Sequence, residues 1–161
     1  MKNKMSMERI LLSFFAIWMC LSVTSCSDDD EPYDHPFVHI MADGGASRVT
    51  VNSDVNNVNS YNVYLSSKAL TKNLVVNYEI LIGDGLQAGR DFELVTQGNS
   101  LTFLPGIYDM AVRIRWKPNK VDPTKNNTLT IRLTGNSMDF TLGLPGPDGL
   151  QRELVIEKKN P

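Results

Sequence analysis

Cysteine is nearly absent from this sequence, and both cysteines, Cys20 and Cys26, stand close to its start. From residue 27 onward the chain has no thiol, so that part can form no disulfide and offers neither a cysteine ligand to a metal nor a cysteine nucleophile. A chain of about 136 residues after the first 25 does not depend on disulfides, because a domain of that size buries most of its apolar surface.

Histidine and blocks of basic charge are also scarce. The two histidines, His35 and His39, are too few for a typical zinc site, and no Gly-x-Ser-x-Gly nucleophile motif occurs. No run of lysine or arginine exists, and 18 acidic residues outnumber 16 basic ones. An acidic balance repels phosphate backbones. We therefore predict a protein that is not an enzyme and that does not bind nucleic acid.

No apolar run is long enough to span a bilayer comfortably, since residues 10–21 fall short of the roughly 20 residues required. This run follows a basic start with Lys2, Lys4 and Arg9, and it ends in the small and polar residues 22–25. The pattern is typical of a secretory signal peptide, which we place at residues 1–25. A retained membrane helix is the alternative, and it too would leave the rest of the chain outside the membrane.

The end of this segment, Val23-Thr24-Ser25-Cys26, resembles the lipobox of bacterial lipoproteins, although it lacks the usual leucine and has serine before the cysteine. The resemblance implies that Cys26 carries a lipid and anchors the protein in the membrane. The next five residues resemble the acidic tag that directs lipoproteins of Bacteroidetes to the cell surface: Ser27, Asp28, Asp29, Asp30 and Glu31. A solvated linker is the plain alternative. We expect a lipidated tether over 26–36 and an outer-membrane location, with the protein facing the cell exterior.

The remaining chain, residues 37–161, consists of short runs in which apolar and polar residues alternate. In residues 73–82, for example, Leu74, Val76, Tyr78, Ile80 and Ile82 share one face at the period of a β-strand. Similar runs cover 100–103, 109–116, 128–133 and 151–157, and weaker ones cover 37–41, 48–51, 61–65, 91–95 and 139–142. Turn residues separate them. The pattern predicts an all-β, two-sheet immunoglobulin-like sandwich of about 7–10 strands.

One succession of motifs is more specific. Gly89-Arg90-Asp91-Phe92 follows a long strand-like run, and a Leu-x-Phe-x-x-Gly step from Leu101 to Gly106 then leads into another. This order resembles the Calx-beta domain over about residues 60–135. Gly89 permits a turn with positive φ, Asp91 can cap nearby amides, and Phe92 can hold the corner in the core. The chain as a whole also resembles uncharacterised surface lipoproteins of Bacteroidetes.

The Calx-beta resemblance raises the question of calcium, because some of these domains bind it. Calcium takes six to eight oxygen ligands, so a site needs several clustered carboxylates. The aspartates of this chain after the tether are isolated at turns and strand ends, which favours a role in turns and predicts no cofactor. If calcium does bind, Asp84, Asp91 and Asp109 are the group that we expect to hold it.

Exposed aromatic rings offer a second kind of site, because sugars stack on them. Tyr64 lies on the strand face opposite Tyr61, and Tyr108 falls in a turn, while Trp116 shares a face with apolar residues that favours burial. Tyr64, Tyr108 and Trp116 are the possible glycan contacts. The leading hypothesis is a non-enzymatic surface lipoprotein that binds a glycan or a protein partner, within a polysaccharide-uptake assembly. A structural or adhesive spacer and a calcium-stabilised domain are the alternatives.

Overall fold

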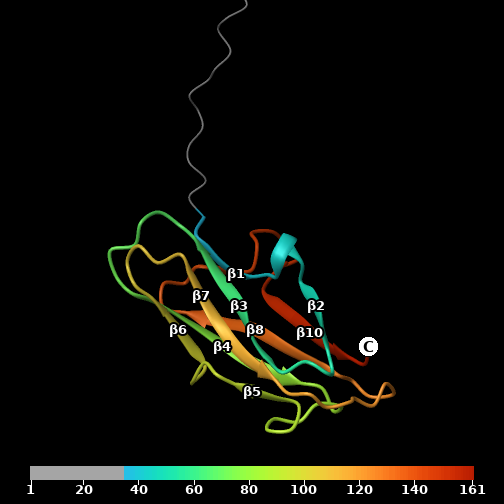
Figure 1. The fold of residues 1–161 in the computed structure, drawn as a ribbon. Helices are drawn as coiled ribbons and strands as arrows, with labels where there is room; N and C mark the ends of the chain where they lie inside the picture. Colours follow the sequence, from blue (N-terminus) through green and yellow to red (C-terminus); the bar gives the residue numbers. More distant parts are fainter. Residues whose placement is uncertain (1–34) are drawn as a thin grey trace, which may run out of the picture. The chain divides into compact units, whose positions relative to one another are not determined.

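The structure is a computed structural model that describes residues 35–161, and within them it contains ten β-strands and one short 3-10 helix, η1 (Figure 1). The strands are β1 (Phe37–Ile40), β2 (Arg48–Asn52), β3 (Asn57–Ser66), β4 (Leu74–Ile82), β5 (Phe92–Leu94), β6 (Ser100–Phe103), β7 (Asp109–Trp116), β8 (Thr128–Asn136), β9 (Thr141–Leu142) and β10 (Glu153–Lys159). Each strand overlaps one of the runs predicted from the sequence. The signal peptide, the lipidation site Cys26 and the acidic tag lie outside the described residues.

The strands form two five-stranded sheets. Sheet 1 has the order β5-β7-β3-β1-β9, and sheet 2 has the order β2-β10-β8-β4-β6. Most neighbours are antiparallel, but β1 pairs with β9 and β2 pairs with β10 in parallel. The prediction of an all-β, two-sheet immunoglobulin-like sandwich is confirmed. Within residues 35–161 no helix has the length and apolar character needed to cross a membrane.

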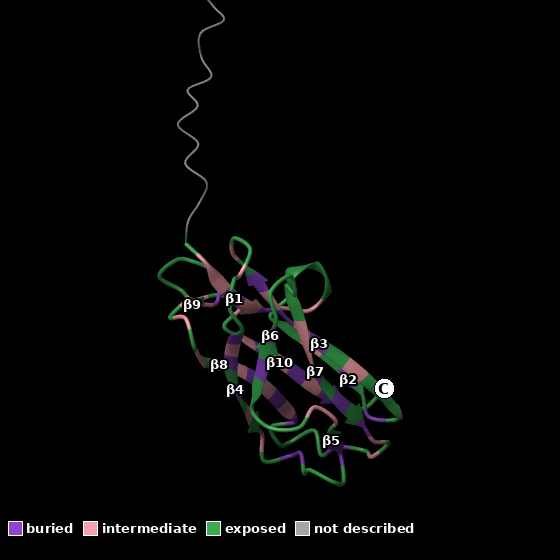
Figure 2. Ribbon diagram, turned by 90° about the vertical axis from the view of Figure 1, so that its left-hand side faces the viewer, coloured by how far each residue is buried: buried purple, intermediate pink, exposed green. Residues whose placement is uncertain are grey.

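The core lies between the sheets and is built from the alternating side chains that the sequence predicted. The burial pattern is banded along the strands, as the colours of Figure 2 show. Fully buried members include Val76, Val112, Ile114, Leu129 and Ile131, at 0% exposure. Each such side chain contributes roughly 1.5–3 kcal/mol when it leaves water. Hydrophobic burial in two facing sheets is therefore the main force that holds the fold together.

Ile82 is a correction to the predicted core, because 46% of its surface is exposed. Ile82 lies on the same strand face as Val76. The neighbouring strand β6, however, pairs only with residues 74–77 of β4 and does not reach Ile82. At Ile82 the strand has become the edge of sheet 2, so its side chain reaches past the core. Strand alternation predicts the face of a residue but not where its neighbouring strand ends.

The first two strands belong to different sheets. After Ile40 the chain leaves sheet 1, passes through η1 (Asp43–Gly45) and joins sheet 2 as β2. Gly44 and Gly45 have φ of 73° and 81°, values that glycine adopts without strain. The early departure has a structural consequence, since β1 pairs only with residues 63–66 of the ten-residue strand β3. The strand itself begins at Asn57, four residues before the start of the predicted run at residue 61.

Candidate functional site

The Gly89-Arg90-Asp91-Phe92 corner is built around a buried carboxylate. Gly89 has φ of 84°, as its turn requires, and Phe92 is 1% exposed. The carboxylate of Asp91 is fully buried and accepts a hydrogen bond from the amide of Gln87 at 2.9 Å. The predicted roles of the glycine as a turn residue, the aspartate as a cap and the phenylalanine as a core anchor are confirmed. This corner fixes the chain where it enters β5.

Three cationic or amide side chains also donate to Asp91. Nε of Arg90 lies 2.8 Å from Oδ2, Nδ2 of Asn119 lies 2.8 Å from Oδ1, and Nζ of Lys158 lies 3.2 Å from Oδ1. Desolvation by burial raises the pKa of Asp91, but the hydrogen bonds from Asn119, Arg90, the Gln87 amide and Lys158 outweigh it and lower the pKa from its ordinary value. The carboxylate is thus kept ionised and structural.

Lys158 is as deeply buried as its partner, with no exposed surface. Besides Oδ1 of Asp91, its ammonium donates to the carbonyl oxygens of Lys117 at 2.9 Å and of Asp91 at 3.4 Å. A buried ammonium is tolerated only when it is paired and its protons are satisfied, and here all three donors have partners. The last strand, β10, is thereby joined to the Asp91 corner and to the end of β7.

The structure does not bring together the three aspartates proposed as a calcium site. Oδ1 of the exposed Asp84 accepts a hydrogen bond from the amide of Asn126, and Asp91 is held by Lys158 and Arg90. Asp109 is the first residue of β7, whereas the carbonyl oxygen of Asp91 accepts a hydrogen bond from the amide of Lys117, which follows the last residue of β7. The two aspartates are therefore separated by about 26 Å of strand. Residues 35–161 contain no group of three acidic, histidine or cysteine side chains that could hold a metal. The calcium site expected from Asp84, Asp91 and Asp109 does not fit this structure.

Trp116 lies in the core and offers no ring to a glycan. Its exposure is 0%, and its ring lies 6.0 Å from that of Phe92 at a tilt of 53°. The indole Nε1 donates a hydrogen bond to the hydroxyl of Tyr61 at 2.9 Å, which satisfies a buried polar group. The strand face that favoured burial therefore decides the role of this residue, and we remove it from the possible glycan contacts.

Tyr64, by contrast, belongs to a row of half-buried rings on the outer face of sheet 1. The ring of His39 lies 5.5 Å from that of Tyr64 and 5.3 Å from that of Phe37. His39 and Tyr64 are direct cross-strand partners in the pairing of β1 with β3. Nδ1 of His39 lies 2.7 Å from Oε1 of Gln151, and this hydrogen bond orients the imidazole. We call Phe37, His39 and Tyr64 the aromatic row.

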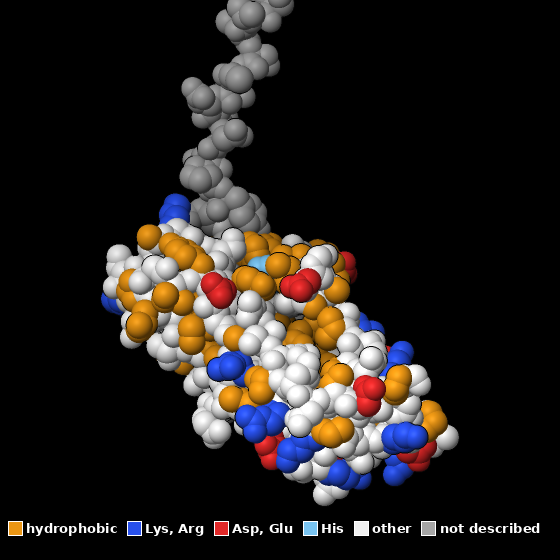
Figure 3. Space-filling view, viewed as in Figure 1, with side chains coloured by type: hydrophobic (Ala, Val, Ile, Leu, Met, Phe, Trp, Pro, Cys, Tyr) orange, Lys and Arg blue, Asp and Glu red, His pale blue; other side chains and the backbone are white. Residues whose placement is uncertain are grey.

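The polar and apolar surroundings of the aromatic row differ along sheet 1. The amide of Asn62 donates to the hydroxyl of Tyr64 at 3.5 Å, and Tyr108, 41% exposed, precedes β7 beside the end of β3. In Figure 3 hydrophobic side chains gather on the upper part of this face, whereas lysine and arginine gather on its lower part. Arg113 and Arg115 stand exposed on the outer face of β7. One face of sheet 1 thus combines half-buried rings with hydrogen-bonding groups.

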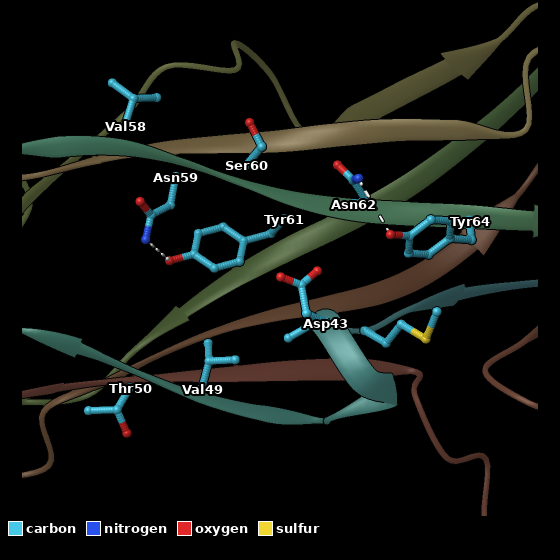
Figure 4. A pocket seen from close by; sticks show the side chains of 11 residues that line it. Asp43, Val49, Thr50, Val58, Asn59, Ser60, Tyr61, Asn62 and Tyr64 are labelled. Atoms are coloured by element: carbon cyan, nitrogen blue, oxygen red, sulfur yellow. Dashed lines mark hydrogen bonds between the residues drawn. The ribbon is translucent and has the colours of Figure 1, made fainter.

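An open groove of about 380 Å³ lies beside the aromatic row, between β3 and β2. Tyr64 and Asn62 line it at one end, and Val49 and Thr50 of β2 line the opposite wall. Figure 4 shows Asn59 and Tyr61 on the side of β3 that faces β2, and the carboxylate of Asp43 pointing into the space between the strands. Asp43 is the charged residue among the side chains that line the groove. The groove exists because β1 ends at Ile40 and leaves the rest of β3 uncovered.

Comparison with known proteins supports the fold. No protein-family model matches the sequence, and no curated protein is significantly similar to it. Among solved structures the chain is similar to the crystal structure of CBD12 from CALX1.2, with a TM-score of 0.56 and 19% sequence identity. The match covers 77% of this chain and 44% of that one, so the chain spans less than half of the structure it matches. The chain has a Calx-beta-like fold.

Two of these features were not predicted from the sequence. The alternation places Phe37 and His39 in a strand, but their spacing does not indicate that they lie against Tyr64, some 25 residues away. The last strand-like run predicted from the sequence ends at residue 157 and gives Lys158 no role, yet this lysine is buried against Asp91. The position of Lys158, on the apolar-facing side of the strand two residues after Ile156 and four after Leu154, is the signal that indicates its burial.

Proposed function

We propose that this chain is a non-enzymatic binding module whose ligand is a glycan bound at the aromatic row. The observation that carries the proposal is the arrangement of Phe37, His39 and Tyr64, whose rings lie side by side on an outer sheet face. Aromatic rings bind the apolar faces of sugars, and adjacent polar groups bind the hydroxyls. A Calx-beta-like fold is compatible with this role, because the fold supplies a rigid sheet for a site without supplying a reaction.

The polar groups around the row fit hydroxyl recognition. The Asn62 amide and the Tyr64 hydroxyl are already within hydrogen-bond distance of each other at 3.5 Å, a long contact that a sugar hydroxyl could replace or bridge. Gln151 holds His39 in place and donates its own amide to the carbonyl of Gly45 at 3.0 Å. A binding surface whose side chains are held before the ligand arrives loses less conformational entropy on binding. Calcium forms no part of the proposal.

The test is glycan-array binding followed by titration calorimetry with the polysaccharide that gives the strongest signal. Tyr64→Ala is expected to weaken binding at least tenfold, because it removes one of the three rings of the row together with its hydroxyl. Leu94→Ala is the matched control, since Leu94 is 37% exposed and lies in the same sheet but away from the row. It pairs with Ile114 of β7, whereas Tyr64 pairs with Asp109, five residues earlier in that strand. Equal affinity of the Tyr64→Ala variant contradicts the site. A protein that binds no glycan on the array supports the spacer alternative.

We further propose that a lipid on Cys26 carries the module at the outer membrane, facing the exterior. The support is the sequence alone, from the basic and apolar start to the cysteine and its acidic successors. Labelling of cells with a radioactive or clickable fatty acid tests it. Cys26→Ala is expected to abolish incorporation, and Cys20→Ala to leave it unchanged. Protease digestion of intact cells then distinguishes an exterior from a periplasmic location.

A further inference from the structure

The main chain of β3 is unpaired along half of one edge. The amide of Leu65 donates to the carbonyl of Tyr108, 2.8 Å away, so the main-chain groups of Leu65 face the β7 side. Because these directions alternate along a strand, Val58, Ser60 and Asn62 direct their N–H and C=O groups away from β7. The opposite edge of β3 is the one that β1 covers at residues 63–66.

The amides of these three residues find no acceptor on that side. β1 ends at Ile40, and its continuation bonds to itself instead, with the amide of Ala42 donating to Ala46 at 2.9 Å. Within residues 35–161 no hydrogen bond reaches the main-chain groups of Val58 and Ser60, or the amide of Asn62, on the side away from β7. We call these groups the open edge. They present donors and acceptors at the spacing of a β-ladder over about 13 Å.

The open edge lacks the devices by which sheet edges usually avoid pairing. Such edges are short or carry proline or charged residues. The edge strands β5, β6 and β9 are short, with three, four and two residues. β3 has ten residues, and its sequence NVNSYNVYLS contains neither a charged residue nor a proline. An unprotected edge on the longest strand of the domain is a feature that binding can explain.

The groove beside the open edge defines what can bind there. Its wall toward the core is formed by Tyr61 and Val49, and its charge comes from Asp43, which makes no ion pair among the described residues (Figure 4). A strand paired with β3 would direct every second side chain toward these residues. Apolar side chains suit the positions against Tyr61 and Val49, and a basic side chain suits the position near Asp43.

We propose that the open edge binds an extended segment of a partner protein, which adds to sheet 1 as an antiparallel strand in line with β1. The bound segment alternates, and its inward side chains are apolar with one lysine or arginine that pairs with Asp43. Main-chain hydrogen bonds supply the affinity, and the groove supplies the specificity. This site adjoins the aromatic row, because Asn62 and Tyr64 line one end of the groove, but strand pairing at the open edge does not depend on glycan binding.

The probe is the synthetic peptide acetyl-Thr-Val-Thr-Lys-Thr-Val-Thr-amide, whose valines and lysine share one face. Titration calorimetry measures its affinity, and hydrogen exchange by NMR reports which amides it protects. We expect protection of the amides of Val58, Ser60 and Asn62, with no new protection in β5 or β6. The same peptide with alternate amides N-methylated is expected not to bind, because it keeps the side chains but loses the ladder donors.

Two substitutions test the geometry. Ser60→Pro removes a donor from the open edge while leaving the pairing with β7 intact, and it is expected to weaken peptide binding about tenfold or more. Val58→Pro serves in its place if that variant does not fold. Asp43→Asn is expected to weaken binding of the lysine peptide by about two- to fivefold and to leave a peptide with threonine in place of lysine unaffected. Asp139→Asn, an exposed change outside the groove, is the matched control.

Several outcomes overturn the proposal. They are unchanged peptide affinity in a folded Ser60→Pro or Val58→Pro variant, equal binding of the N-methylated peptide, and protection that appears elsewhere in the domain. Self-association that protects the same three amides at rising protein concentration, without peptide, assigns the edge to a second copy and also overturns it. A Tyr64→Ala variant that loses glycan but keeps the peptide shows that the two sites are distinct.

Discussion

The ammonium of Lys158 lies 3.2 Å from Oδ1 of Asp91, and neither side chain has any exposed surface. The two residues are 67 positions apart in sequence, and their contact ties β10 to the turn before β5. Buried ion pairs add little net stability relative to apolar packing, but the loss of one partner is costly because it leaves a buried charge uncompensated. The pair therefore acts as a strong constraint on how the sandwich closes at this end.

The two members of the pair are expected to differ in the cost of their loss. Asp91→Ala removes the charged partner of Lys158, whose ammonium keeps only two carbonyls, and should destabilise the domain by about 3–5 kcal/mol. Lys158→Met leaves Asp91 with Arg90, Asn119 and the Gln87 amide, and should cost about 1–3 kcal/mol. Urea unfolding followed by tryptophan fluorescence measures both. Equal costs would show that the two partners are equally dependent on each other.

An exposed ion pair supplies the control for this comparison. Arg48 lies 3.4 Å from Glu157, and its side chain is 59% exposed. Surface pairs of this kind contribute at most about 1 kcal/mol, because water and salt screen them. Arg48→Ala is accordingly expected to change the free energy of unfolding by less than about 1 kcal/mol. A larger loss would indicate a second role for Arg48 in packing β2 on β10.

The stability of the domain is expected to fall in acid because of Asp91. Its pKa is lowered in the folded protein relative to the ordinary value of 3.8, so the folded state favours the ionised carboxylate more than the unfolded chain does. The resulting stabilisation is fully present above about pH 4 and is lost as the pH falls toward the folded pKa. Unfolding curves from pH 6 to pH 2 measure it. Asp91→Asn should flatten this dependence, and an unchanged slope in that variant contradicts the assignment.

Gly85 is expected to be intolerant of a side chain. It is buried, and a Cβ atom there would overlap Oδ1 of Asn127 and lie 2.9 Å from its Cγ and 3.0 Å from the carbonyl oxygen of Asn126. The side chain of Asn127 is held by its hydrogen bond to the carbonyl of Asp122 at 2.7 Å, so it cannot yield freely. Gly85→Ala should therefore lower the free energy of unfolding by about 1–3 kcal/mol.

Gly135 gives the contrasting case for the same substitution. A Cβ atom at this position would lie 3.9 Å from its nearest neighbour, Nδ2 of Asn77, and the φ of Gly135 is not in the left-handed region. Gly135→Ala is expected to leave stability within about 1 kcal/mol of the parent or to raise it, since alanine restricts the unfolded chain more than glycine does. Thermal melts by circular dichroism compare the two variants. A loss at Gly135 as large as that at Gly85 would contradict the steric explanation.

Strand positions were predictable here because burial in a two-sheet fold imposes a period of two on each strand. The run that contains Val112, Ile114 and Trp116 shows this directly, and the burial of Trp116 was favoured on the same ground. Prediction was poorer where a strand reaches the end of its sheet. Ile82 has the pattern of a core residue but lies beyond the last pairing with β6. The polar start of β3 was missed because Asn57 and Asn59 do not alternate with apolar neighbours in an obvious way.

The sequence by itself determined the all-β class, the approximate positions of about 7–10 strands and the turn at Gly89, because alternation and backbone freedom act over a few neighbouring residues. The tertiary structure decided which distant residues meet: Asp91 with Lys158, His39 with Tyr64, and the open edge of β3 with the groove beside β2. Those contacts depend on sheet order and on where β1 ends, which are set by the packing of the whole chain. No local pattern records them.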